Sequence, residues 1–255
     1  MAGKEANDPA AGAGSARRES LPKRFYKDVA VKDEGSEAAL LLDGKPVRTP
    51  GKAKLALPTR ALADAVAEEW RAQADRIDPA TMPLTRLTNS AIDGVRGQEL
   101  AVAADIVRHA GSDLVCYRAE RPQGLAAAQA KHWDPVLTWT ERDLEAPLRH
   151  AEGVVHVAQP QASLDQIEKR LQGFDAFGLA ALHVMTQLTG SALLALALGL
   201  GQLTPEEAWA AANVDEDWQI GQWGEDADAA ARCAYRKRDF DAAARMLKLS
   251  GNEPN

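Results

Sequence analysis

The hydrophobic pattern of this chain changes once along its length, and that change limits the folds open to it. Residues 24–57 carry short runs with a period near two, broken by turn signals at Asp43-Gly44 and Pro50-Gly51. From Pro83 onward the apolar residues recur at helical spacing instead. The sequence therefore predicts an α+β protein, in which a small β-rich N-terminal domain with a covering helix precedes a larger all-α C-terminal domain.

The same pattern divides the chain into three segments. Residues 1–22 are rich in alanine and glycine without periodicity, which predicts a disordered tail. We expect the β-rich domain over residues 23–80 and the helical domain over residues 81–255. Four short strands should form a meander, covered by a helix that Thr59 caps and that extends to about Arg76.

The helical domain should centre on its most apolar segment, residues 177–200, which predicts one helix. The helix before this segment should begin at its cap, Ser163, and extend to Phe174. Residues 226–249 should form the last helix. Residues 124–144 predict a long helix that is kinked or restarted at its internal proline. Residues 154–157 predict a short extended connector.

Composition excludes several classes of protein. The net charge of −7 argues against a general nucleic-acid binder, which normally presents a basic face. Cys116 and Cys233 lie far apart without a CxxC motif, which predicts neither a disulfide framework nor a zinc site and fits a reducing compartment. The most apolar run, residues 192–200, is about nine residues, against roughly 20 for a membrane span. The first 20 residues lack the apolar core of a secretory signal. We expect a cytoplasmic protein without a presequence, membrane insertion or a nucleic-acid partner.

Motifs for enzymatic chemistry are missing from the sequence. It contains neither a GxxxxGK[ST] phosphate loop nor a GxSxG nucleophile elbow. The five histidines share no metal-ligand spacing, and His183 on an apolar helix favours a satisfied core histidine. The sequence therefore predicts no catalytic residue, cofactor, metal site or small-molecule substrate.

Residues 204–224 carry strong helix signals. Thr204 can cap the N-terminus, Pro205 suits the first helical position, and Glu207 completes a capping box. Gly224 can end the helix in a left-handed conformation. These signals predict one helix over the whole segment.

The side chains of this predicted helix do not follow the usual amphipathic pattern. At about 100° per residue, Trp209, Ile220 and Trp223 share one stripe, and Glu216 lies in the middle of it. Trp218 points nearly opposite to Trp209. An acid on an apolar face and a tryptophan on a polar one indicate either a helix covered on two sides or a surface that awaits a partner.

Acidic residues cluster around this segment and cations follow it. For the outer acids we expect surface ion pairs between two antiparallel helices, and a solvated acidic face is the alternative. For Glu216 two interpretations stay open, an internal arginine partner or contact with a basic group on another protein. The acids are Asp215, Glu216, Asp217, Glu225, Asp226 and Asp228, and the cations are Arg232, Arg236, Lys237 and Arg238.

Several motifs together resemble a known family, the ATP12-type assembly chaperones of the F1 part of ATP synthase. The resemblance covers about residues 24–249 and rests on the order and spacing of its motifs. These are KRFYKDV (23–29), LDGKPVRTP (42–50), LPTRALADAVAEEW (57–70), MPLTRLTNSAID (82–93), CYR (116–118), WDPVLTW (133–139) and DEDWQIGQWG (215–224). It implies a non-enzymatic chaperone that binds the free F1 α subunit and shields its β-facing surface, built as a small β-rich domain followed by a helical one.

The resemblance also implies a partner-binding site in the last motif. The family's functional acid matches Glu216, with Asp215 and Asp217 beside it. The predicted partner-binding residues are Glu216, Asp217, Trp218, Gln219 and Trp223. A helical adaptor for another partner and a small-molecule enzyme using His183 or these acids are the alternatives. The mitochondrial members carry a presequence, which this chain is expected to lack.

Overall fold

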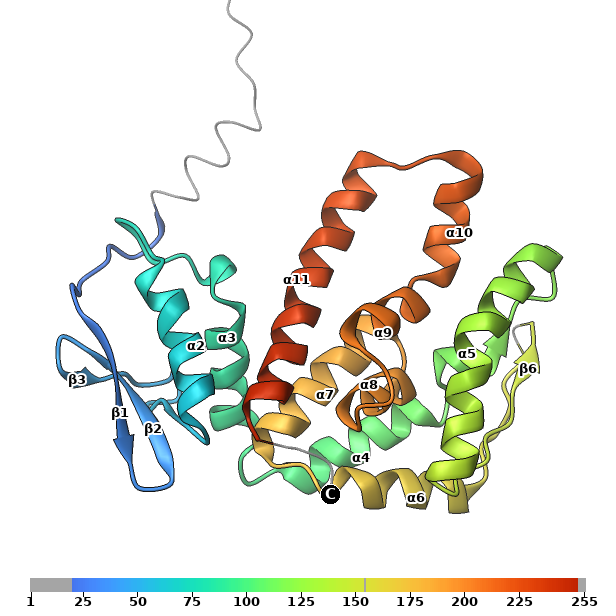
Figure 1. The fold of residues 1–255 in the computed structure, drawn as a ribbon, viewed down its shortest axis with the longest axis horizontal. Coiled ribbons are helices and arrows are strands. Elements are labelled where there is room, and N and C mark those ends of the chain that lie inside the picture. Colours follow the sequence, from blue (N-terminus) through green and yellow to red (C-terminus); the bar gives the residue numbers. More distant parts are fainter. Residues whose placement is uncertain (1–19, 154, 252–255) are drawn as a thin grey trace, which may run out of the picture.

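A computed structural model describes residues 20–153 and 155–251 of the 255-residue chain (Figure 1). Helices make up most of the molecule, and a small sheet lies at its N-terminal end. The predicted α+β class, with the helical part following the β-rich part, is confirmed. Most of the predicted tail, residues 1–19, lies outside the described residues.

The sheet is organised around its second strand. β1 (Val29–Glu34) and β2 (Glu37–Leu42) pair antiparallel along their full length. After β2, Asp43 and Gly44 both take positive φ values, 48° and 75°, as a two-residue hairpin turn requires. β3 (Lys45–Pro46) and β4 (Ala56–Leu57) then both pair with β2. The four predicted strands exist, but β4 pairs with β2 instead of β3, and four of the six residues of β2 are buried.

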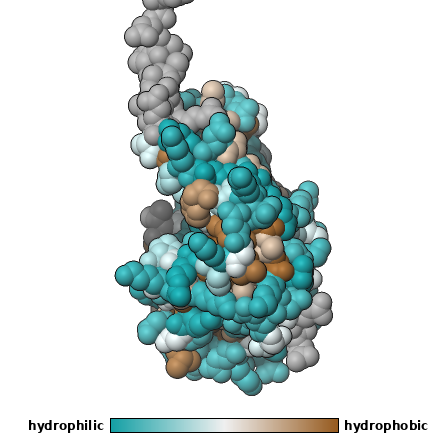
Figure 2. Space-filling view, turned by 90° about the vertical axis from the view of Figure 1, so that its left-hand side faces the viewer, coloured by the Kyte–Doolittle hydropathy of each residue, from teal (hydrophilic) through white to brown (hydrophobic). Residues whose placement is uncertain are grey.

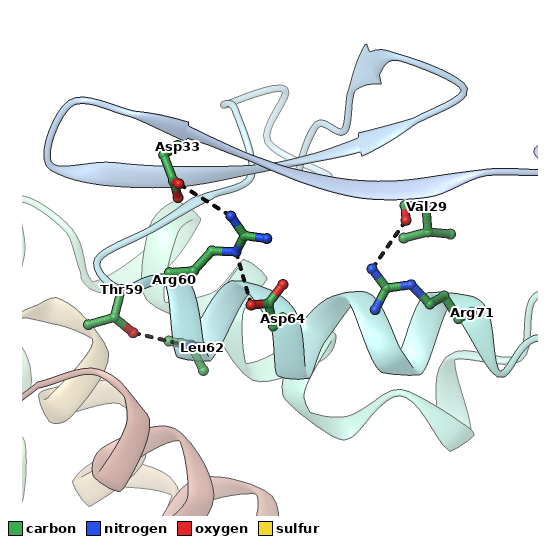
Figure 3. A network of polar contacts seen from close by, with 7 residues as sticks. All are labelled: Val29, Asp33, Thr59, Arg60, Leu62, Asp64 and Arg71. Carbon is green, nitrogen blue, oxygen red and sulfur yellow. Dashed lines mark hydrogen bonds and ion pairs between the residues drawn. The ribbon is translucent and has the colours of Figure 1, made fainter.

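Helix α2 (Arg60–Arg71) covers the sheet and is shorter than predicted. Thr59 caps it by accepting a hydrogen bond from the Leu62 amide at 3.1 Å. Figure 3 shows Arg60 between Asp64 and Asp33, while Arg71 donates to the Val29 carbonyl at 3.2 Å. Such exposed ion pairs contribute at most about 1 kcal/mol each. The buried apolar face of α2 therefore supplies most of the attachment.

The helical part follows directly, and α7 lies at its centre, in contact with α4, α8 and α11. Two residues, Tyr117 and Arg118, pair with a second short strand in a separate parallel ladder. The elements are η1 (Pro79–Thr81), α3 (Pro83–Ser90), the π-helical turn η2 (Ala91–Val95), α4 (Glu99–Ala110), η3 (Leu114–Cys116), β5 (Tyr117–Arg118), α5 (Gln123–Asp143), β6 (Ala151–Glu152), α6 (Gln161–Leu171), α7 (Ala176–Thr189), α8 (Ala192–Gly199), α9 (Pro205–Ala212), α10 (Val214–Trp223) and α11 (Ala227–Leu249).

The most apolar segment is two helices, so the prediction of one helix over residues 177–200 was wrong. Gly190 takes a left-handed φ of 70° and ends α7, and Ser191 caps α8 through the Leu194 amide at 3.0 Å. Asp113 lies buried beneath this break and accepts hydrogen bonds from the Ser191 hydroxyl and the Leu193 amide. Both helices are buried on nearly all sides, so the sequence is hydrophobic on both sides of the break. The hydrophobic pattern therefore gives no sign of where α7 ends and α8 begins.

Other local predictions can also be scored. Ser163 is not the cap of α6, because the helix begins at Gln161 and the Ser163 hydroxyl donates to the Pro147 carbonyl at 2.6 Å. Helix α5 continues through Pro135 without a fresh start. The extended connector was predicted over residues 154–157, but the strand pairing in this region occurs just before it, at β6. Val154 lies outside the described residues. The last helix, predicted over residues 226–249, is α11, and Asp226 is its N-cap.

The β-rich and helical parts are joined by polar and apolar contacts. Glu69 on α2 accepts hydrogen bonds from the amides of Leu84 and Thr85 at the start of α3, at 2.8 and 2.7 Å. Arg245 on α11 pairs with Glu68 on α2 at 2.9 Å. One hydrophobic cluster includes side chains from both parts. The domain boundary between residues 80 and 81 therefore stays a prediction. Among the described helices, none has the length and apolarity to cross a bilayer.

Candidate partner-binding groove

The segment 204–224 consists of two helices, so the prediction of a single helix was wrong. Thr204 and Glu207 form the predicted capping box at the start of α9. The break falls at Asn213, whose side-chain amide donates to the Trp209 carbonyl at 2.8 Å and so competes with the backbone. Trp133 of α5 donates its indole N–H to the Ala211 carbonyl at 2.7 Å, taking an acceptor that a continuous helix would use.

The break changes which residues share a face. Trp209 packs against Phe240 with ring centroids 5.1 Å apart, whereas Ile220 is 43% exposed and Trp223 is 80% exposed. Gly224 ends α10 with φ of 88° and ψ of 169°, a positive φ as predicted but outside the left-handed helical region. The predicted apolar stripe is therefore divided into a buried part at its start and an exposed part at its end.

Helices α10 and α11 form an antiparallel hairpin that projects from the helical part (Figure 1). Between them lies a groove of about 700 Å³, which we call the hairpin groove. Side chains of the protruding half of α11 are mostly exposed, and its continuous burial begins near Phe240. The groove is lined by Trp209, Glu216, Asp217, Gln219, Ile220, Trp223, Gly224, Glu225, Asp226, Ala229, Ala230, Arg232, Cys233, Ala234, Arg236 and Lys237.

Four of the five predicted partner-binding residues line the hairpin groove: Glu216, Asp217, Gln219 and Trp223. Trp218 instead turns toward α5. Its ring lies so close to Gly124 that a Cβ placed there would be 2.2 Å from the ring. Trp218 therefore anchors α10 to the body of the molecule, and it is absent from the groove lining because its side chain points to the other side of the helix.

Glu216 is more exposed than the sequence suggested. Its side chain is 53% exposed and pairs with Arg236 of α11 at 3.2 Å. Arg236 also donates to the Leu188 carbonyl at 2.8 Å and lies 5.7 Å from the centre of the Trp209 ring. The internal arginine partner is thus present, but the carboxylate is not buried. A pair this exposed stabilises the fold by at most about 1 kcal/mol, which leaves Glu216 accessible at the groove.

The three consecutive acids point to different surroundings, as helical geometry requires. Asp215 accepts a hydrogen bond from the Gln129 side chain of α5 at 2.7 Å. Partial burial raises the pKa of Asp217, the nearby Glu216 carboxylate raises it further, and His132 of α5 opposes both effects. Asp215 therefore holds α10 on α5, while Glu216 and Asp217 face the groove.

Charge in the hairpin groove changes along its length. Near the tip lie Glu225 and Asp226, and Asp226 caps α11 by accepting from the Ala229 amide at 2.8 Å. Arg232, Arg236 and Lys237 line the deeper part. Among the described residues, Glu216–Arg236 is the one ion pair that joins α10 to α11. The predicted lacing of two antiparallel helices by several ion pairs is therefore wrong, and the acids at the tip remain solvated.

Sequence reasoning treated the cations on the α11 side of the groove as ion-pair partners and assigned them no part in partner binding. Arg232, Cys233, Arg236 and Lys237 all line it. A signal for them was present, since the helix stop at Gly224 and the cap at Asp226 imply a tight reversal between two helices. Such a hairpin places the first turns of α11 opposite the last turns of α10.

The groups considered for enzymatic chemistry lie elsewhere. His183 of α7 is half-buried and its Nε2 lies 2.9 Å from the Asp105 carboxylate of α4, so it is paired at a surface and not enclosed in the core. Neither residue lines the hairpin groove. Within the described residues, no three His, Cys, Asp or Glu side chains are arranged to hold a metal ion.

Comparison with known proteins identifies relatives over most of the chain. Residues 23–141 match the family model described as ATP12 chaperone protein. The "Protein atp12, mitochondrial" of Schizosaccharomyces pombe is 24% identical over 219 residues, which is 81% of this chain and 75% of that protein. The hairpin groove lies after the residues that the family model matches.

Solved structures give a more extensive match. The crystal structure of Atp12 from Paracoccus denitrificans is 43% identical and has a TM-score of 0.84, with 90% of this chain and 98% of that chain covered. The crystal structure of the Atu1473 protein from Agrobacterium tumefaciens is 48% identical with a TM-score of 0.87, covering 96% of this chain and 92% of that one. At this identity over nearly the whole length of the Paracoccus protein, the chain belongs to the ATP12 chaperone family.

Proposed function

We propose that this protein is an assembly chaperone of ATP synthase, which binds the unassembled α subunit of F1 and shields its β-facing surface until F1 forms. The hairpin groove is the contact surface in this proposal. The observation that carries it is Trp223, a large apolar side chain that is 80% exposed at the edge of the groove. Exposed tryptophans of this kind favour a protein interface, because their burial contributes strongly to binding.

The composition of the groove suits reversible coverage of one subunit. Ile220 and Trp223 supply apolar area, while Glu216 and Arg236 supply charges of both signs close together. Apolar area provides affinity, and paired charges favour one orientation of the partner over others. The hairpin projects from the body of the protein, so a partner can reach both of its helices (Figure 1).

The two alternatives differ from this proposal in what they require. A small-molecule enzyme needs a pocket where His and acidic side chains converge, and the groove acids and the His183–Asp105 pair belong to separate places. A helical adaptor would use the same groove with another partner, so only the identity of the bound protein separates it from the chaperone. The proposal includes a non-enzymatic role and a cytoplasmic location, with which the free thiols Cys116 and Cys233 agree.

Co-purification tests the partner directly. The tagged chain is co-expressed with the α subunit alone or with the β subunit alone, and the soluble and bound fractions are measured. We expect a 1:1 complex with α, more soluble α and no retention of β. Equal retention of both subunits, or α that stays insoluble and unbound, would contradict the proposed function.

A cysteine footprint tests the surface. Cys233 lines the groove and is partly exposed, whereas Cys116 is buried, and burial raises its thiol pKa to about 12. Alkylation at neutral pH should therefore report on Cys233. We expect its alkylation rate to fall at least about tenfold when the α subunit is present at about ten times Kd or more, because only the unbound fraction then reacts. An unchanged rate in a complex that does form would place the partner on another surface.

A further inference from the structure

A second pocket lies in the β-rich part, and it shares no lining residue with the hairpin groove. It has a volume of about 350 Å³, at the small end of the range of about 300–1,000 Å³ for ligand sites. Three segments build it: the residues before β1, the β2–β3 turn and the end of α2. Its lining is Phe25, Tyr26, Leu42, Asp43, Lys45, Pro46, Val47, Arg48 and Trp70. We call it the aromatic pocket.

The walls of the aromatic pocket are held in place by contacts within the chain. The Tyr26 hydroxyl donates to the Trp70 carbonyl at 2.7 Å, and the two rings lie 5.6 Å apart. Arg24 lies over the Tyr26 ring at 4.6 Å and donates to the carbonyls of Tyr26 and Gln73. A pocket fixed in this way loses little conformational entropy when a ligand enters.

Phe25 is exposed although it is held in position. Its side chain is 72% exposed and stacks edge-on against Tyr26 with centroids 5.4 Å apart. Figure 2 looks onto this end of the molecule and shows hydrophobic residues gathered within a hydrophilic surround. The indole Nε1 of Trp70 is buried and has no hydrogen-bond acceptor among the described residues. The pocket thus offers apolar area, chiefly the exposed ring of Phe25.

The rim of the aromatic pocket is positive on a chain whose net charge is −7. Asp43 is the single acid among its described lining residues, and its carboxylate accepts from the amides of Lys27 and Asp28 at 3.0 and 2.8 Å. The Lys45 ammonium has no ion pair or hydrogen bond within the described part of the chain. Arg48 donates to a backbone carbonyl, that of Lys52. Lys45 lies within electrostatic reach of Asp43, but the two cations Lys45 and Arg48 outnumber this one acid in the lining. An excess of cations beside the exposed Phe25 ring favours an acidic ligand with an apolar anchor.

We propose that the aromatic pocket binds an extended, acidic, proline-containing segment of a partner protein. Aromatic-lined grooves recognise such segments because an extended proline-containing chain is already ordered and its prolines pack on the rings. Carboxylates of the segment pair with Lys45 and Arg48 at the rim. This surface is separate from the hairpin groove, so the inference goes beyond the proposed function and does not depend on it.

The test is a titration of the full-length protein with the acetylated, amidated peptide EEPLPEE, followed by NMR. The Trp70 indole N–H resonance, assigned with the Trp70→Phe variant, is the readout. We expect a saturable shift with a Kd below about 1 mM at about 20 mM salt, and binding at least about fivefold weaker at 300 mM salt because of screening. Lack of saturation at several millimolar peptide, or an equal response to the charge-reversed peptide KKPLPKK, overturns the proposal.

Matched variants separate the pocket from general electrostatics. Lys45→Glu and Phe25→Ser alter exposed side chains and should each weaken binding at least about fivefold. Lys32→Glu makes the same charge change on the same sheet outside the lining and should leave binding unchanged. Trp223→Ser, in the hairpin groove, should also leave peptide binding unchanged. A failure of the aromatic-pocket proposal can therefore be distinguished from a failure of the proposed function. Equal weakening by Lys32→Glu and Lys45→Glu overturns the proposal.

The Trp70 indole N–H resonance also tests for two other occupants of the aromatic pocket, residues 1–19 of this chain and a second copy of it. If removal of residues 1–19 shifts the Trp70 signal of the free protein and strengthens peptide binding, this chain's own segment fills the pocket. If the signal depends on protein concentration, a second copy fills it. Either result overturns the proposal, and an unchanged free spectrum in both experiments supports it.

Discussion

Replacement of Trp223 by alanine should greatly weaken partner binding while the fold is kept. A buried tryptophan covers about 150–250 Å², and Trp223 is 80% exposed in the free chain. Roughly 120–200 Å² is therefore left for a partner to cover, worth about 3–5 kcal/mol at about 25 cal/mol per Å². Ordering the side chain costs about 0.5–1.5 kcal/mol, which leaves about 1.5–4.5 kcal/mol, or roughly 12–1,600-fold in Kd.

The assay compares Trp223→Ala with a matched control. Leu100 of α4 is 73% exposed and lies outside the hairpin groove, so Leu100→Ala also removes a large exposed apolar side chain. Both variants should keep Tm within about 2 °C of the parent, because neither removes a buried contact. Kd for the α subunit is measured by calorimetry. A change below about threefold for Trp223→Ala, or equal weakening by Leu100→Ala, would refute the argument that Trp223 anchors the partner.

Three further predictions concern charge, packing and pH. Glu216→Lys should lower Tm by no more than about 4 °C, since its exposed pair with Arg236 is worth at most about 1 kcal/mol, yet weaken α-subunit binding several-fold in calorimetry. Gly124→Ala should destabilise the protein by about 1–3 kcal/mol in urea, because its Cβ would meet the Trp218 ring at 2.2 Å. Burial raises the pKa of Asp113 from 3.8 to about 6, so the Asp113 contribution to the unfolding free energy should rise by about 2–3 kcal/mol as pH falls from 7 to 4.

Each of these has its own control. Gross unfolding of Glu216→Lys by circular dichroism would mean that the carboxylate is structural and not a recognition group. Gly221→Ala in α10 has open space around its Cβ and should be neutral or slightly stabilising; equal loss from both glycines would rule out the clash. For Asp113, the pH dependence should be reduced in Asp113→Asn, and identical urea curves against pH in both proteins would contradict the buried carboxylate as its source.

Local chemistry explains the parts of the fold that the sequence predicted well. The turn at Asp43-Gly44, the cap at Thr59 and the capping box of Thr204 and Glu207 all depend on a few adjacent residues. These signals need no knowledge of the rest of the molecule. The change from strand to helix periodicity was enough to give the α+β class.

Contacts between distant segments decided the helix breaks. The apolar run 177–200 is divided at Gly190, where the buried Asp113 carboxylate holds the start of α8. The segment 204–224 is divided at Asn213, where Trp133 of α5 takes the Ala211 carbonyl. Neither break is visible in hydrophobic periodicity, because the groups that stabilise them lie some 80 residues earlier in the chain.

The candidate site shows the same division. Sequence alone located an unusual combination of acids and tryptophans at residues 216–223, and the chain's resemblance gave that segment a role to test. Only the tertiary structure decided that Glu216 is exposed and paired with Arg236, that Trp218 packs on Gly124, and that Trp223 stays open to solvent. Helical spacing fixes the direction of a side chain relative to its own axis, but what covers that side chain depends on segments packed against it from elsewhere in the chain.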